Sequence, residues 1–159
     1  MKVNLKDIII GKGLGDIQFG CSKEKLKYLI GEPDEIDSYN ASGEEDDYLT
    51  EAWHYDEHEF SVSFDQEDNW RLTTISISSP DCLISDKQLI GKSMDAVLET
   101  LENENLGENE LDDLSDGETN QKLISFLPAS LNLWFENDQL SEIQWGVLWS
   151  DEDTPRWPE

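Results

Sequence analysis

The segment EFSVSFDQEDNWRLTTISIS, residues 59–78, carries the clearest secondary-structure signal in the chain. In residues 59–64, phenylalanine and valine alternate with serine, and residues 71–78 alternate isoleucine with threonine or serine. A period of two residues is typical of a strand that buries one face. Asp68 and Asn69 lie between the two runs and favour a turn there. The segment therefore predicts two neighbouring antiparallel strands.

Further strands and two helices are predicted on either side of this segment. Ser22 and Ser93 are suitable helix N-caps, and each precedes a run that places apolar residues on one helical face. Gly31 and Pro33 end the first of these helices. The remaining aliphatic or alternating runs predict strands at residues 5–10, 52–55, 122–127, 131–135 and 140–149.

The two parts of the chain follow the same plan. Gly91 and Ser93 each lie 71 positions after Gly20 and Ser22. An internal repeat predicts a fold built from repeated units. We therefore expect the α+β class, with two tandem helix plus antiparallel-sheet units in a single domain, whose strands form one or two antiparallel sheets packed on helices. The repeats would cover about residues 8–79 and 82–149, and an acidic C-terminal tail at residues 150–159 is expected to form a flap rather than a strand.

The string GDIQFGCSKEKLKYLIGEP, residues 15–33, resembles the strand–helix opening of a known repeat family. In that family a Gly-x-Ser/Thr turn begins a helix, a Gly-x-Pro ends it, and a strand with Trp or Tyr opens the sheet, as residues 53–55 do here. The family includes the beta-lactamase inhibitor protein and the BamE-like (SmpA/OmlA) outer-membrane assembly lipoproteins. The opening is also similar to bacterial immunity proteins encoded beside polymorphic or contact-dependent-inhibition toxins. The resemblance implies tandem repeats and a role in binding another protein.

The net charge of the chain is strongly negative. The 159 residues contain 37 Asp and Glu against 11 Lys and Arg, which gives a formal charge of −26. No lysine or arginine occurs between Lys27 and Arg71 or between Lys92 and Lys122. Such a field repels nucleic acids and anionic membranes and attracts basic partners. The alternative interpretation is that the charge serves solubility alone.

The sequence also bears on location and redox state. The first residues lack the apolar core of a signal peptide, no lipid-attachment Cys lies near the N-terminus, and no apolar run is long enough to span a membrane. We therefore expect a cytoplasmic protein, with Cys21 and Cys82 as free thiols.

No set of residues converges on a catalytic or metal site. His54 and His58 are four apart, but their surroundings predict a strand and a turn, which separate the rings. Cys21 lies beside a predicted helix start, which would lower its pKa, yet a packed small residue is the expected role. The glycine-rich residues 11–15 lack the phosphate-loop pattern. We therefore expect no enzyme activity, no cofactor and no metal.

A recognition surface is better marked than an active site. Alternation places Ser61, Ser63, Ser76 and Trp134 on the outer face of the predicted sheet. Trp134 is expected to anchor a partner, or else to be covered by the C-terminal flap through Trp157. Acidic loops would surround this face, and their candidate residues are Glu44, Glu45, Asp46, Asp47, Glu108, Glu110, Asp112 and Asp113.

These features together predict an immunity protein that binds and neutralises a cognate toxin, most readily a basic, nuclease-like domain. Its acidic loops would replace nucleic-acid phosphates against the basic side chains of the toxin. The alternative is a structural or assembly scaffold without enzymatic activity. An exposed sheet edge would also allow a homodimer.

Overall fold

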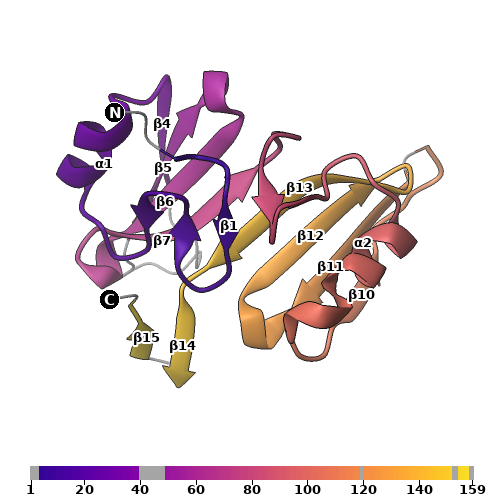
Figure 1. Ribbon diagram of the computed structural model, residues 1–159. Coiled ribbons are helices and arrows are strands. Elements are labelled where there is room, and N and C mark those ends of the chain that lie inside the picture. The colour runs from indigo at the N-terminus through magenta and orange to yellow at the C-terminus, as the bar shows by residue number, and fades with distance from the viewer. Residues whose placement is uncertain (1–3, 40–48, 119, 152–153, 158–159) are drawn as a thin grey trace.

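The computed structural model describes residues 4–39, 49–118, 120–151 and 154–157 (Figure 1). Its largest element is one antiparallel sheet of eight strands. In spatial order the strands are β10 (Glu110–Asp113), β11 (Gln121–Phe126), β12 (Leu131–Glu136), β13 (Gln139–Gly146), β7 (Arg71–Ile77), β6 (Phe60–Asp65), β5 (Thr50–Tyr55) and β4 (Glu35–Tyr39).

The smaller elements are short. Three small sheets accompany the large one: β1 (Ile8–Ile9), β2 (Gly13–Leu14) and β3 (Ile17–Gln18) form the first, β8 (Leu83–Ile84) and β9 (Lys87–Gln88) form a hairpin, and β14 (Leu148–Asp151) pairs with β15 (Thr154–Arg156). The two α-helices are α1 (Lys23–Ile30) and α2 (Met94–Leu101). The 3₁₀ turns are η1 (Asp56–His58), η2 (Gln66–Asp68), η3 (Glu102–Glu104) and η4 (Leu127–Ala129).

The expected α+β class with two tandem helix plus antiparallel-sheet units is wrong. The described residues contain only two α-helices of eight residues each, and strands dominate the chain. The strands from both parts of the sequence join one continuous sheet, because β7 pairs with β13 from Ile77↔Ile143 to Thr74↔Gly146. Separate sheets would have left β7 and β13 as edges with unpaired backbone groups, and their pairing removes that cost.

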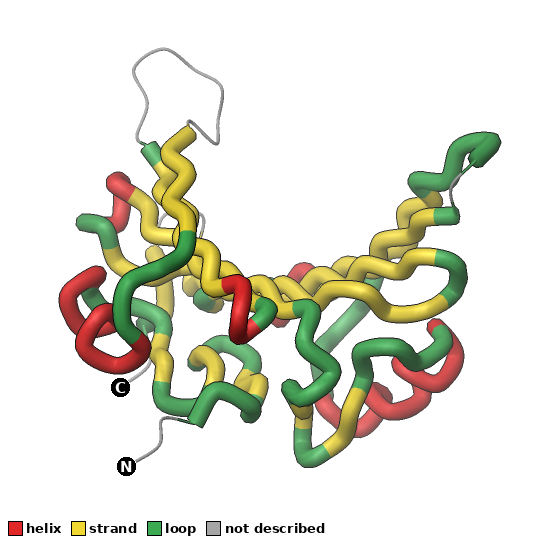
Figure 2. Tube along the Cα trace, turned by 90° about the horizontal axis from the view of Figure 1, so that it is seen from above, coloured by secondary structure: helices red, strands yellow, loops and turns green. Residues whose placement is uncertain are grey.

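Both helices begin at the serines that the sequence marks as caps. The Ser22 side chain accepts a hydrogen bond from the backbone N–H of Lys25, and Ser93 does the same for Ala96. The helices lie on the same side of the large sheet as the small strands β1–β3 and β8–β9, which leaves the other side uncovered (Figure 2).

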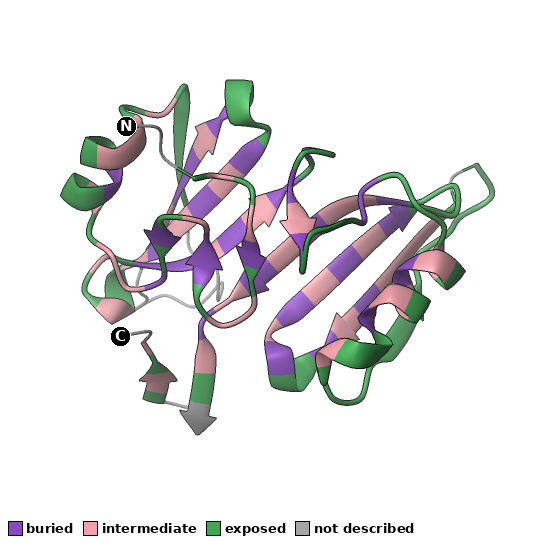
Figure 3. Cartoon of the chain, viewed as in Figure 1, coloured by how far each residue is buried: buried purple, intermediate pink, exposed green. Residues whose placement is uncertain are grey.

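The hydrophobic core fills the space between the large sheet and this layer. The strands alternate buried and partly exposed residues along their length, which appears as stripes in Figure 3. Phe60, Val62 and Phe64 point into the core, whereas Ser61 and Ser63 occupy the opposite face.

The two acidic stretches and the tail contain more structure than the sequence indicates. Edge strands β4 and β10 lie in stretches expected to be acidic loops, and all their described side chains are exposed. The tail is expected to avoid strand structure, yet β15 pairs with β14. Their composition gives a weak strand signal, because edge strands bury little and therefore need no apolar alternation.

Candidate functional site

The uncovered side of the large sheet is the candidate site, and we call it the open face. Directly paired residues of an antiparallel sheet point to the same face, so the register defines its rows. One row crosses all eight strands: Glu35, His54, Ser61, Ser76, Gln144, Asn132, Ser125 and Glu110. Two shorter rows flank it: Asp37, Ala52, Ser63, Thr74 and Gly146; and Glu142, Trp134, Leu123 and Asp112.

The open face is concave and acidic. Figure 2 shows that the two ends of the sheet, near β4 and β10, bend away from the helices and so form the sides of a trough. These three rows contain five carboxylates and no lysine or arginine, whereas a further row at the ends of β5, β6 and β7 adds Thr50, Asp65 and Arg71 to the same face. The carboxylates lie near both ends and in the middle, and their fields add in the concavity between them.

Trp134 lies on β12 between Glu142 and Leu123 and is partly exposed. Its indole Nε1 is buried and has no hydrogen-bond partner among the described residues. An unsatisfied buried donor costs about 1–3 kcal/mol. Trp157 does not supply a cover for it, since its ring lies against Gly20 and 5.4 Å from the Arg71 guanidinium.

Two hollows open on this face. One of about 290 Å³ lies between β7, β13 and β12, and Asp65, Gln144 and Trp149 are among its walls. Trp149 is 44% exposed and forms part of this wall. The second hollow, of about 270 Å³, includes Ser61, Ser76 and Glu142. No lysine or arginine lines either hollow.

A polar chain on the open face links three neighbouring strands. His54 Nε2 lies 2.9 Å from Asp37 Oδ2, and its Nδ1 lies 2.7 Å from Ser61 Oγ. The order Ser–His–Asp matches the arrangement of an activated serine. Ser61, however, lies inside β6, whose backbone pairs with β5 and β7, so the surrounding N–H groups point along the sheet rather than at a reacting oxygen. The chain serves to tie β4 to the sheet.

The structure brings together only part of the predicted site. Ser61, Ser63, Ser76 and Trp134 share the open face with Glu110 and Asp112 of the edge strand β10. Glu108 is exposed in the segment that precedes β10. Asp113 pairs with Lys122 and points to the other face, and bonds from Ser115 hold the pKa of its carboxyl below the usual value. Glu44, Glu45, Asp46 and Asp47 lie outside the described residues.

The sequence did not reveal the hydrogen bonds that link Asp37, His54 and Ser61, nor did it reveal the two hollows. Once the two strands and their buried faces are identified, the alternation of residues places His54 and Ser61 on the same face of the sheet. Their pairing, and the position of Asp37 on a strand hidden in an acidic stretch, require the register. The hollows arise from the curvature of the sheet, which no local pattern encodes.

The thiols and the metal candidates show no sign of special chemistry. Burial raises the pKa of both Cys21 and Cys82 to about 11, and at Cys21 this effect outweighs the lowering by the nearby charge of Lys25. Among the described residues there is no cluster of three or more His, Cys, Asp or Glu side chains suited to a metal. His58 stacks on Phe60, away from the bonds that His54 makes. Within the described residues no helix is both long and apolar enough to cross a membrane.

Comparisons with known proteins show no family for this chain. No family model matches it, and no curated protein matches it. Its structure is similar to that of an extracellular protein containing an SCP domain from Bacillus anthracis str. Ames, with 17% sequence identity and a TM-score of 0.44. The match covers 80% of this chain but 43% of the other protein. A similarity this low assigns no function to the chain.

Proposed function

We propose that this protein binds a basic protein on its open face and neutralises it, as an immunity protein does with its toxin. The observation that carries the proposal is the row of polar side chains across all eight strands, which begins at Glu35, ends at Glu110 and contains no lysine or arginine. A concave surface of one sign favours a partner of the opposite sign and suppresses others.

The geometry supports two stages of binding. The acidic field would steer a basic partner to the trough and raise its association rate. Lysine or arginine side chains of the partner would then enter the hollows beside Asp65 and Glu142, where the carboxylates replace nucleic-acid phosphates. Trp134 would anchor the complex through the exposed part of its ring, since tryptophan is enriched among the residues that dominate binding energy.

The decisive experiment is co-expression of the chain with the product of the adjacent open reading frame, with cell survival and co-purification as readouts. Survival that depends on this chain, together with a stable complex, is the expected result. A harmless neighbour that forms no complex would overturn the proposal and leave the assembly scaffold as the better interpretation.

A charge-reversal pair locates the interface. Glu110→Lys with Asp112→Lys should slow association at low salt by roughly tenfold or more and reduce protection. The matched control is Glu99→Lys with Glu102→Lys, which makes the same charge change on exposed residues of α2 and η3. Equal effects of the two pairs would show that net charge, rather than the open face, governs binding. Association measured from low to high salt should fall steeply for the wild type.

A further inference from the structure

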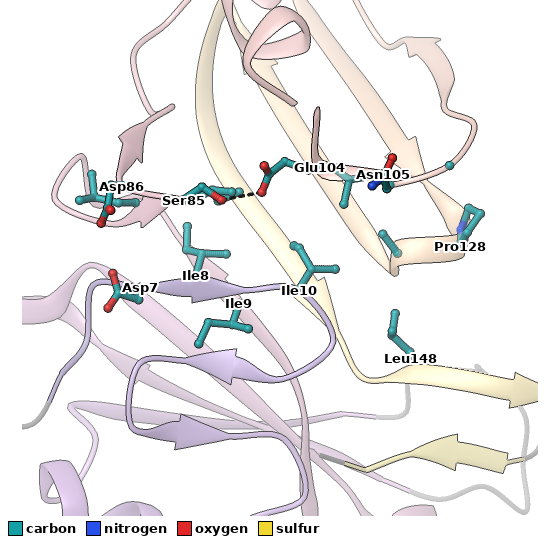
Figure 4. A pocket seen from close by; sticks show the side chains of 15 residues that line it. Asp7, Ile8, Ile9, Ile10, Ser85, Asp86, Glu104, Asn105, Pro128 and Leu148 are labelled. Atoms are coloured by element: carbon teal, nitrogen blue, oxygen red, sulfur yellow. Dashed lines mark hydrogen bonds between the residues drawn. The ribbon is translucent and has the colours of Figure 1, made fainter. Parts of the chain in front are cut away.

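A cavity of about 700 Å³ lies on the helix side of the large sheet, away from the open face. Its walls come from residues 7–10, 83–86, 104–107 and 128–129, together with Leu148 (Figure 4). Segments far apart in the sequence thus meet around one space. The volume is in the range of pockets that bind small molecules.

The inner wall of the cavity is apolar. Ile8, Ile84 and Leu106 belong to the buried core and are at most 8% exposed, while Ile9 is 41% exposed. Figure 4 shows that the side chains of Ile8 and Ile10 point into the space between their own segment and the segments that contain Ser85 and Glu104. A hydrocarbon chain placed against this wall would leave water at about 25 cal/mol for each Å² buried.

The rim of the cavity is acidic. Asp7, Asp86 and Glu104 are the only charged residues that line it, so no lysine or arginine of the lining balances them. The position of the rim is set by local structure, because Ser85 and Asp86 form the two-residue turn between β8 and β9, both with positive φ. Ser85 Oγ donates to Glu104 Oε1 at 2.6 Å and joins two of the walls.

We propose that this cavity binds a small amphiphilic cation, with its apolar chain against the isoleucines and its positive nitrogen among the carboxylates of the rim. An apolar wall alone would accept any hydrophobic ligand of suitable size. The three carboxylates restrict the choice, since they repel a fatty acid and favour an alkylammonium group. The inference is independent of the proposed function, because the cavity and the open face lie on opposite sides of the sheet.

The test compares three probes that share one chain and differ in charge: octylammonium, octanol and octanoate. Each is titrated into the ¹⁵N-labelled protein, and amide chemical shifts are followed. Octylammonium should shift amides of residues 8–10, 84–86 and 105–107 with saturation and should bind roughly fivefold more tightly than octanol, the factor expected for a partly exposed charge pair. Octanoate should bind more weakly than octanol.

Two variants separate the parts of the site. Asp86→Asn with Glu104→Gln should remove most of the preference for octylammonium over octanol, whereas Glu57→Gln with Glu67→Gln, at exposed positions outside the cavity, should leave it unchanged. Ile10→Ser should weaken all three probes, since the side chain of Ile10 points toward the cavity (Figure 4). The amide spectrum of each variant reports whether the protein remains folded.

Three results would overturn the inference. They are the absence of saturable binding of octylammonium, equal affinity for octanoate, and shifts spread over the acidic surface rather than around the cavity. The last result would indicate a general attraction of cations to the net charge of −26.

Discussion

Trp145 connects the large sheet to the N-terminal strands, and its replacement by phenylalanine tests how strongly the two layers depend on each other. The side chain of Trp145 is fully buried, and its Nε1 donates a hydrogen bond to the carbonyl oxygen of Gly13 at 3.2 Å, across 132 positions of the chain. Phenylalanine keeps an aromatic ring in the core but removes the donor and part of the volume.

The expected cost follows from two terms. Loss of the donor leaves the buried Gly13 carbonyl without this partner, at about 1–3 kcal/mol. The smaller side chain leaves a space of about 40 Å³, which at roughly 24 cal/mol per Å³ adds about 1 kcal/mol. Trp145→Phe should therefore lower the free energy of unfolding by about 2–4 kcal/mol, or the melting temperature by about 4–16 °C for a chain of this size.

Urea denaturation followed by far-ultraviolet circular dichroism measures this change without relying on tryptophan fluorescence. Trp149→Phe is the matched control, since Trp149 is 44% exposed and its replacement should cost less than about 0.5 kcal/mol. Equal effects of the two substitutions, or a cost below about 0.5 kcal/mol for Trp145→Phe, would refute the contact as a link between the layers.

Three further changes test individual contacts. Ser22→Ala removes the acceptor of a 3.1 Å bond at the start of α1 and should cost about 1 kcal/mol in urea denaturation, whereas Ser22→Asp should retain most of the stability; no loss in Ser22→Ala would contradict the cap. Burial raises the pKa of Cys82 from 9.0 to about 11, so an aromatic disulfide reagent should label it slowly at neutral pH and faster as the pH approaches 11. The unfolded thiol ionises first, so this group's contribution to stability is present below pH 9.0 and lost as the pH rises to about 11; rapid labelling at neutral pH would argue against the burial. His54→Ala removes the bonds to Asp37 and Ser61, and hydrogen exchange should accelerate in β4 while β12 and β13 are unchanged; uniform acceleration would indicate general destabilisation instead.

Local features of the chain were predictable from the sequence. The alternation in residues 59–64 and 71–78 predicts β6 and β7 within about one residue, because a strand with one buried face must repeat every two residues. Ser22 and Ser93 predict both helix starts, since the cap bond depends only on residues three positions apart. The acidic charge is likewise a property of composition alone.

The tertiary structure decided how these elements combine. The pairing of β7 with β13 joins residues far apart in the chain and decides between the one or two sheets that the sequence left open, in favour of one. The hydrogen bonds that link Asp37, His54 and Ser61 depend on an edge strand that shows no apolar alternation. The cavity beside Ile8 is formed by segments that are distant in the sequence. Cross-strand register and the packing of distant surfaces are determined by the whole chain. A strand can pair with any free strand edge, and an apolar face can pack against any other, so the neighbours of a residue in the sequence do not determine its partner.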